Sequence, residues 1–302
     1  MGWRESLTAR FSLSGEAWWG LALSGPAMVL MLALLIGPLL AIVVLSVSDW
    51  QLGMPDIGWV GLDNYHQLAA DGVFWKAVRN TSVYVLVVMF GSVGLGLLLA
   101  LLIEGCSYGK SLYRTLFFLP VMASLVAMTI VWEFLLHPEF GLINQLLMAF
   151  GGETRNWLRD EDWALVALCV IGIWHQAGFN MVLFMAGLTA VPRTLYEAAD
   201  IDGIPRGFTR FRLITWPLLG PVTLFVVVMT AINAFQVFDT VQILTQGGPS
   251  HSTEVLLLTL YREGFEFFRT GYAAAMTVIF LGAVMLITLL KTRFLEKRVH
   301  YS

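Results

Sequence analysis

Two long apolar runs of the sequence carry polar side chains whose chemistry is hydrogen bonding. The six residues are His175, Gln176 and Asn180 in the first run, and Asn233, Gln236 and Thr240 in the second. Gln176 and Asn180 are four residues apart, so on a helix they share a face, whereas His175 points about 100° away. The second group follows spacings of three and four, which also places its members on one face. The two polar stripes could together line a wet cavity.

Two interpretations of these stripes stay open at this point. Polar groups are costly inside an apolar environment, so they are candidates for function by default. Amide side chains suit neutral hydroxylated ligands, because each offers a donor and an acceptor. Alternatively, Asn180 and Asn233 simply hydrogen-bond neighbouring helices. Proton transfer through His175 would need a second charged group in the same run, and the run contains none.

Catalytic chemistry is not indicated. A hydrolase needs clustered nucleophile and base groups or metal ligands, and the apolar runs hold only the isolated His175. The stretch GCSYGKS, Gly105 to Ser111, has three residues between its glycines where a phosphate-binding loop requires four. Cys106 lies in a short polar loop and Cys169 in an apolar run, so no disulfide is expected. We therefore predict no catalytic residue, no metal site and no cofactor on this chain.

The elements that position these side chains are predicted to be membrane-spanning helices. Hydrophobic residues make up 58% of the 302-residue chain and charged residues only 13%, with a positive mean hydropathy. A water-soluble surface is hard to build from such a composition. The formal net charge of −3 offers no basic excess for binding nucleic acid. We expect an integral membrane protein that lies in a lipid bilayer and has no nucleic-acid partner.

Six stretches are long enough, or nearly so, to cross a hydrocarbon core of about 30 Å, which needs about 20 mostly apolar residues. They are residues 19–47, 81–103, 116–136, 163–188, 218–238 and 273–290. The first exceeds the roughly 7–15 apolar residues of a secretion signal, so we predict a retained span. No internal repeat or soluble domain is found. The prediction is a single all-α transmembrane domain over residues 1–302.

The basic residues predict the orientation of the chain. Six spans put both termini on one side, and an excess of Lys and Arg marks the cytoplasmic side. Twelve of the 18 basic residues fall on the side of the termini: Arg4, Arg10, Lys110, Arg114, Arg193, Arg206, Arg210, Arg212, Lys291, Arg293, Lys297 and Arg298. We therefore predict cytoplasmic termini, with the loops 48–80, 137–162 and 239–272 outside.

A charged insert over residues 189–217 separates the fourth and fifth predicted spans. Its first half has an apolar stripe at helical spacing, and Gly203 suits the C-terminal cap of a short helix. Such a helix is charged enough to lie in water while it keeps a small apolar face, which suits docking into a groove of a cytoplasmic partner. The alternative is a solvated loop in which Arg193 and Glu197 form an i,i+4 pair.

This insert resembles the EAA loop of binding-protein-dependent ABC importers, which is the cytoplasmic coupling helix of the permease subunit. The matching residues are Glu197, Ala198 and Ala199, then Gly203, Ile214 and Pro217. Four further blocks resemble the carbohydrate branch of these permeases, which contains maltose and glycerol-phosphate importers. The blocks are YRTLFFLP (113–120), WHQAGFNMVLFMAGL (174–188), FQVFDTVQILTQGGP (235–249) and GYAAAM (271–276).

The resemblance implies a six-span, MetI-like permease in a bacterial inner membrane. ATP and Mg²⁺ are then expected on a separate ATPase dimer, and an extracytoplasmic binding protein delivers the solute. A second homologous permease is implied, because one chain presents a single coupling helix and the ATPase dimer offers two clefts. The residues expected to couple to the ATPase are Glu197, Ala198, Ala199, Asp202 and Gly203.

The same resemblance implies a substrate site formed partly by spans four to six. Carried over by position, the expected contacts are Gln236 first, then Asn233 and Asn180, and further Gln176, Thr240 and His175. The sequence does not select among carbohydrates, polyols and their phosphorylated or acidic derivatives. An ion-coupled secondary carrier, with His175 or Glu133 as its ion site, is the alternative function.

One spacing departs from the pattern of this family. The usual motif has nine residues between the glycine and the isoleucine, whereas ten residues separate Gly203 from Ile214 here. An added residue rotates everything that follows on a helix by about 100°. We expect the turn around Pro205 and Gly207 to absorb it.

Overall fold

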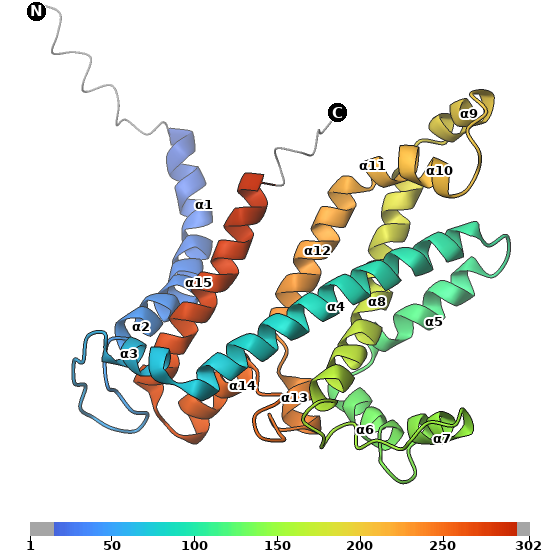
Figure 1. Ribbon diagram of the computed structural model, residues 1–302. Helices are drawn as coiled ribbons and strands as arrows, with labels where there is room; N and C mark the ends of the chain where they lie inside the picture. Colours follow the sequence, from blue (N-terminus) through green and yellow to red (C-terminus); the bar gives the residue numbers. More distant parts are fainter. Residues whose placement is uncertain (1–14, 295–302) are drawn as a thin grey trace, which may run out of the picture.

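The structure is a computed structural model that describes residues 15–294 as helices joined by turns (Figure 1). In chain order these are α1 (Gly15–Met31), η1 (Leu32–Ile36), α2 (Gly37–Leu45), α3 (Asp63–Ala70), α4 (Gly72–Gly105), α5 (Lys110–Met122), α6 (Leu125–Leu135), α7 (Leu142–Ala149), α8 (Ala164–Ala190), α9 (Arg193–Ile201), α10 (Phe208–Arg210), η2 (Phe211–Thr215), α11 (Trp216–Leu218), α12 (Gly220–Phe235), α13 (Asp239–Leu244), α14 (Leu256–Tyr261), η3 (Arg262–Glu266) and α15 (Thr270–Phe294). Over this range no β-strand occurs. The predicted all-α fold class is confirmed.

Several of these helices are long and apolar enough to cross a membrane. Within residues 15–294 four qualify by themselves: Ala22–Leu45, Gly72–Gly105, Ala164–Ala190 and Gly220–Leu244. The pair α5 and α6 adds a fifth only if both parts are counted as one span, and the apolar part of α15, Thr270–Leu286, is shorter. The chain is therefore a multi-pass helical protein, while the number of six spans stays a prediction.

The third predicted span, residues 116–136, is not one straight helix. The axes of α5 and α6 differ by 99° across a short break. Ala123 and Ser124 there adopt extended ψ angles of 147° and 126°, which interrupts the helical hydrogen bonds. Pro120, inside the last turn of α5, also lacks an N–H to continue the ladder. Hydropathy missed the bend because both arms are apolar.

The fifth predicted span, residues 218–238, is also interrupted. Helix α12 ends at Phe235, the backbone turns through Gln236 to Phe238, and α13 starts at Asp239. Phe238 has φ −145° and ψ −62°, outside the helical region. The interruption places Gln236 in a turn between two helices, where its side chain is exposed.

The second predicted span begins nine residues earlier than expected, because residues 72–80 are helical rather than part of a loop. Asp71 is the N-cap of α4, and its carboxylate accepts hydrogen bonds from the backbone N–H groups of Val73 at 2.8 Å and Phe74 at 3.3 Å. With 34 residues, α4 is about 51 Å long. It therefore exceeds a hydrocarbon core of about 30 Å, and its first turns extend beyond it or the helix tilts.

Helix α4 crosses α8 and α12, and the three helices enclose the main core (Figure 1). The crossing is close because glycines face the partner helix. A Cβ added to Gly96 would lie 2.7 Å from Cβ of Asn180 and 3.1 Å from the carbonyl oxygen of Ala177. Small residues at such crossings let two helix backbones approach, which is the usual packing solution in membranes.

The two ends of the bundle carry different elements. The start of α1, the end of α15 and helix α9 lie at one end, whereas α3, α6, α7, α13 and α14 lie at the other (Figure 1). The assignment of the first end to the cytoplasm stays a prediction. Four of the basic residues on which it depends, Arg4, Arg10, Lys297 and Arg298, lie outside the described residues.

Candidate functional site

A small cavity of about 150 Å³ lies where α8 meets the interruption between α12 and α13. Its walls come from α4, α6, α8, α12, α13 and the turn at residues 236–238. The lining residues are Tyr84, Val88, Leu125, Ile171, Gly172, His175, Gln176, Asn233, Ala234, Gln236, Val237, Phe238, Asp239 and Thr240. Residues that are far apart in the sequence therefore share one polar cavity.

Five of the six predicted substrate contacts line this cavity. His175 and Gln176 come from α8, Asn233 from the last turn of α12, Gln236 from the turn, and Thr240 from α13. The interruption of α12 brings Gln236 and Thr240 to the same wall, because the chain changes direction after Phe235. Both predicted polar stripes thus contribute, although the second is not a continuous helical face, because α12 ends before Gln236.

Four polar side chains of the cavity have no hydrogen-bond partner in the described part of the chain. Across residues 15–294, no hydrogen bond joins the side chain of His175, Gln176, Asn233 or Gln236 to another residue. Buried polar groups in proteins are ordinarily paired. An amide that is partly buried and has no protein partner can instead bond water or a hydroxylated solute.

Asn180, the sixth predicted contact, lies elsewhere. It is fully buried between three helices. Its Nδ2 donates to the hydroxyl of Ser92 on α4 at 3.1 Å, and its Oδ1 accepts from the hydroxyl of Thr230 on α12 at 2.9 Å. The geometry is that of a polar link between helices, and Asn180 is not among the residues that line the cavity.

Sequence reasoning did not select Tyr84 or Phe238, which also line the cavity. Tyr84 lies on α4, a helix whose apolar run gives no polar periodicity. Tyr84 comes close to Gly172 only because α4 crosses α8. No spacing in the sequence therefore predicts that Tyr84 lines the cavity. Asp239 adds a carboxylate to the same cavity as His175, a neighbour that the search along single runs did not find.

Helix α9 corresponds to the charged insert and projects from the opposite end of the bundle (Figure 1). Glu197, Ala198, Asp202 and Gly203 are exposed on it, whereas Ala199 is buried against the rest of the chain at 2% exposure. The residues predicted to couple thus divide into one that anchors the helix and four that are open to a partner.

The predicted C-terminal cap of this helix is present. Gly203 has a φ of +70°, a conformation that glycine adopts at low cost. The backbone N–H of Ile204 donates to the carbonyl of Ala199 at 2.9 Å, and the N–H of Gly203 donates to that of Asp200 at 3.4 Å. This pair of bonds is a Schellman motif, which ends the helix sharply.

A charged cluster holds the segment after this cap against α9. Arg210 and Arg206 both bind the carboxylate of Asp200, at 2.6 Å and 3.3 Å. Their hydrogen bonds, that of Arg210 first, hold the pKa of Asp200 below its usual value. Arg210 also donates to the carbonyl of Ile204 at 3.0 Å, and the hydroxyls of Tyr196 and Thr215 lie 2.9 Å apart. The insert is therefore an ordered unit rather than a loose loop.

The ten-residue spacing after Gly203 coincides with a wide helical turn. Over η2 the chain is π-helical, and the N–H of Trp216 donates to the carbonyl of Phe211, five residues earlier. A π turn holds one residue more than an α turn, which is enough to absorb the excess residue. The expected turn at Gly207 is also present, with a φ of +99°.

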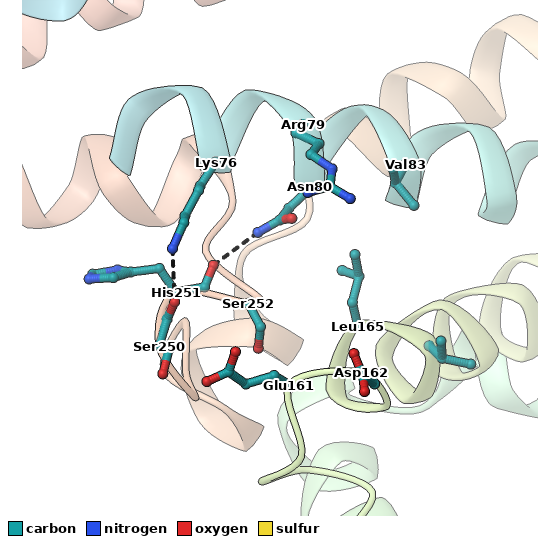
Figure 2. A pocket seen from close by; sticks show the side chains of 11 residues that line it. Lys76, Arg79, Asn80, Val83, Glu161, Asp162, Leu165, Ser250, His251 and Ser252 are labelled. Carbon is teal, nitrogen blue, oxygen red and sulfur yellow. Dashed lines mark hydrogen bonds between the residues drawn. The ribbon is translucent and has the colours of Figure 1, made fainter. Parts of the chain in front are cut away.

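A second cavity, of about 380 Å³, lies at the end of the bundle opposite α9. Figure 2 shows Lys76 and Arg79 of α4 on one wall and Glu161 and Asp162, just before α8, on the other. No ion pair joins the two walls in the described part of the chain. The cavity therefore presents unneutralised cations opposite unneutralised carboxylates.

The loop between these walls is fastened to α4. Asn80 donates through Nδ2 to the carbonyl of His251 at 3.1 Å, and Lys76 Nζ donates to the carbonyl of Ser250 at 3.4 Å (Figure 2). Asn80 Nδ2 also donates to the carbonyl of Glu254 at 3.0 Å. The Glu254 carboxylate is buried at 1% exposure and is paired with Arg262 at 3.1 Å. Three hydrogen bonds therefore hold this loop against α4.

Comparison with known proteins identifies the family. Residues 92–301 match the family described as binding-protein-dependent transport system inner membrane component. The chain is 35% identical to the probable ABC transporter permease protein YurN of Bacillus subtilis, over 90% of this chain and 94% of that protein. It is 34% identical to the lactose transport system permease protein LacF of Rhizobium radiobacter, over 95% and 96%.

Another relative is the sn-glycerol-3-phosphate transport system permease protein UgpA of Agrobacterium fabrum, which is 34% identical over 81% of this chain and 83% of that protein. Among solved structures, a chain of a bacterial ABC transporter involved in the import of alginate superposes with a TM-score of 0.81. The two chains are 22% identical, and the match covers 93% of this chain and 96% of the other. The folds are the same.

Proposed function

The chain belongs to the binding-protein-dependent transport system inner membrane components, the permeases of carbohydrate ABC transporters, and we propose that it is the membrane-spanning subunit of an ATP-driven importer. The solute is a carbohydrate, a polyol or a related small molecule that an extracytoplasmic binding protein delivers. ATP and Mg²⁺ bind to a separate ATPase pair, and no covalent chemistry takes place on this chain.

The observation that carries this proposal is the cavity at the interruption of α12. Transporters commonly bind their substrates near the midplane where a helix is discontinuous. Here the interruption collects four side chains without protein partners, and amides and imidazole suit the hydroxyl groups of a sugar or polyol. A volume of about 150 Å³ is smaller than a drug-sized pocket, so the cavity suits one small polar unit at a time.

Helix α9 supplies the proposed mechanical link. Its exposed residues Glu197 and Ala198 suit a cleft of the ATPase, and the Schellman cap with the Asp200 cluster makes it rigid enough to transmit a displacement. Closure of the ATPase pair would then move α9 together with α8, which precedes it in the chain, and α12, which follows it. These two helices carry most of the cavity, so its exposure would change from one side to the other.

The cavity between α4 and the start of α8 is the proposed contact for the binding protein. It lies at the end of the bundle opposite α9, and its separated charges offer partners to side chains of either sign. A relative with this fold has been solved in complex with a periplasmic protein that carries an alginate pentasaccharide. A second permease would complete the pathway, because this chain offers one coupling helix.

Reconstitution tests the proposal. The chain is placed in liposomes with a second permease, an ATPase and a binding protein from the same organism, and uptake of radiolabelled lactose and of sn-glycerol 3-phosphate is measured. We expect uptake that requires both ATP and the binding protein and that survives ionophores. Uptake that needs no ATPase and collapses with the ion gradient would favour an ion-coupled carrier in which His175 and Asp239 share the cavity.

A further inference from the structure

Tyr84 is a buried polar residue of the cavity for which the protein provides no partner. It lies on α4, its side chain is only 5% exposed, and it lines the cavity together with Gln176 and Gln236. Among residues 15–294 its hydroxyl makes no hydrogen bond. The ring itself packs in the core beside Val88 and Leu168.

The position of the hydroxyl is fixed by Gly172. Of all atoms around this glycine, the Tyr84 hydroxyl oxygen would be the nearest to an added Cβ, followed by Cγ2 of Val88 at 2.9 Å. The hydroxyl therefore occupies the space that any larger residue at position 172 would fill. Gly172 and Gln176 lie one helical turn apart on α8, and both line the same cavity as Tyr84.

The other buried hydroxyls of α4 are paired, which sets Tyr84 apart. Ser92 accepts from Asn180 at 3.1 Å, and Thr81 accepts from the backbone N–H of Leu256 at 3.0 Å. Among the described residues, the Tyr84 hydroxyl is not one of the fully buried unpaired side-chain atoms, so it stays accessible from the cavity. A polar group in that position usually bonds water or a ligand. A tyrosine hydroxyl can both donate and accept, as the hydroxyl groups of a carbohydrate do.

We propose that Tyr84 is a substrate-contacting residue, with its hydroxyl bonded to a hydroxyl group of a carbohydrate or polyol and its ring limiting the width of the cavity. This inference rests on the proposed import function. It assigns α4 a part in substrate selection, in addition to the helices that carry the polar stripes. It also gives Gly172 a reason to be glycine, because a side chain at this position would collide with the Tyr84 hydroxyl.

Cysteine labelling tests the position without knowledge of the substrate. In a chain with Cys106→Ser and Cys169→Ala, single substitutions Tyr84→Cys, Gln236→Cys and Ala100→Cys are compared in the full transporter in liposomes. The probe is the membrane-impermeant cation 2-(trimethylammonium)ethyl methanethiosulfonate. Ala100, on the same helix and 0% exposed, is the buried control.

We expect the thiols at positions 84 and 236 to react and the thiol at position 100 to stay unlabelled. Reaction at 236 but not at 84 would overturn the role of Tyr84 and leave the import function standing. Reaction at neither 84 nor 236 would contradict a water-accessible cavity, and with it both proposals.

Transport measurements then test the hydroxyl itself. Tyr84→Phe removes one oxygen and keeps the packed ring, while Tyr108→Phe makes the same change at a tyrosine that is 90% exposed in the turn after α4. For whichever of lactose and sn-glycerol 3-phosphate is imported, we expect Tyr84→Phe to lower kcat/KM about fivefold. Assembly and basal ATP hydrolysis should not change, and Tyr108→Phe should behave as the wild type.

If the wild-type transporter imports a probe and Tyr84→Phe imports it with the same kcat/KM, a hydrogen bond between the Tyr84 hydroxyl and the substrate is ruled out. If the wild-type transporter imports neither probe, these two solutes are excluded from the proposed function, and the labelling result alone decides the assignment of Tyr84. The two proposals therefore fail in distinguishable ways.

Discussion

Asn180 and Ser92 are joined by a hydrogen bond of 3.1 Å between the amide nitrogen of one and the hydroxyl oxygen of the other. The same amide accepts from Thr230 at 2.9 Å, so a single side chain connects α8 to both α4 and α12. Gln236 is chemically similar but faces the cavity with no partner. Two amides with the same chemistry thus have different positions, and their substitutions should have different consequences.

Asn180→Ala is expected to destabilise the helix bundle, because it leaves two buried hydroxyls without their partner. Polar links between membrane helices are worth about 0.6–2 kcal/mol. The measurement is the unfolding temperature and the yield of the purified transporter, with Gln236→Ala as the control that should leave both unchanged. A stable Asn180→Ala protein with altered substrate preference would instead place Asn180 in the substrate site.

Gln236→Ala is expected to weaken uptake without disturbing assembly. The residue is exposed in the turn between α12 and α13, so its loss removes a ligand contact and little packing. One hydrogen bond corresponds to a loss of about two- to tenfold in kcat/KM, measured as initial uptake by reconstituted transporter. Unchanged uptake and selectivity would remove this residue from the site.

Glu197→Lys is expected to separate ATP hydrolysis from uptake while the helices stay inserted, because it reverses a charge on the exposed face of α9. The measurement compares ATP hydrolysis and solute uptake in the same liposomes. Glu153→Lys, at an exposed acidic residue of the loop before α8, is the matched control. Full uptake by Glu197→Lys would contradict the role of α9 in coupling.

Deletion of Arg212 is expected to be tolerated, because the π turn over residues 211–215 can become an α turn with one residue less. The residues after the deletion then keep their orientation about the helix axis, so we expect the variant to retain more than about half of the wild-type uptake. Deletion of Ala231 from the uninterrupted helix α12 is the control, since it rotates the following residues by about 100°. Equal loss in both variants would show that the π turn does not absorb a residue.

Lys76→Glu with Arg79→Glu is expected to weaken the stimulation of ATP hydrolysis by the binding protein. Exposed interface charges act mainly on association, so the half-maximal concentration of binding protein should rise about three- to tenfold at low salt and less at high salt. Arg159→Glu, an exposed residue outside the cavity, is the control. An unchanged concentration would exclude this cavity as the docking contact.

The sequence by itself determined where the long apolar helices lie and where the short helix α9 ends. Long apolar runs dictate membrane helices, and the predicted range 163–188 agrees closely with α8, because nothing within that run breaks a helix. The cap of α9 also followed from local chemistry, since Gly203 adopts the left-handed conformation that ends it. Such features depend on residues close in the chain, whose preferences a sequence displays directly.

The tertiary structure alone decided which polar residues are paired and which are free. Asn180 and Gln176 share a predicted helical face, yet α4 and α12 close over the first and leave the second open. Tyr84 joins the cavity only because α4 crosses α8 at Gly172. Pairing depends on which atoms of neighbouring helices come within hydrogen-bond distance. The spacing of residues within one helix does not predict which atoms those are.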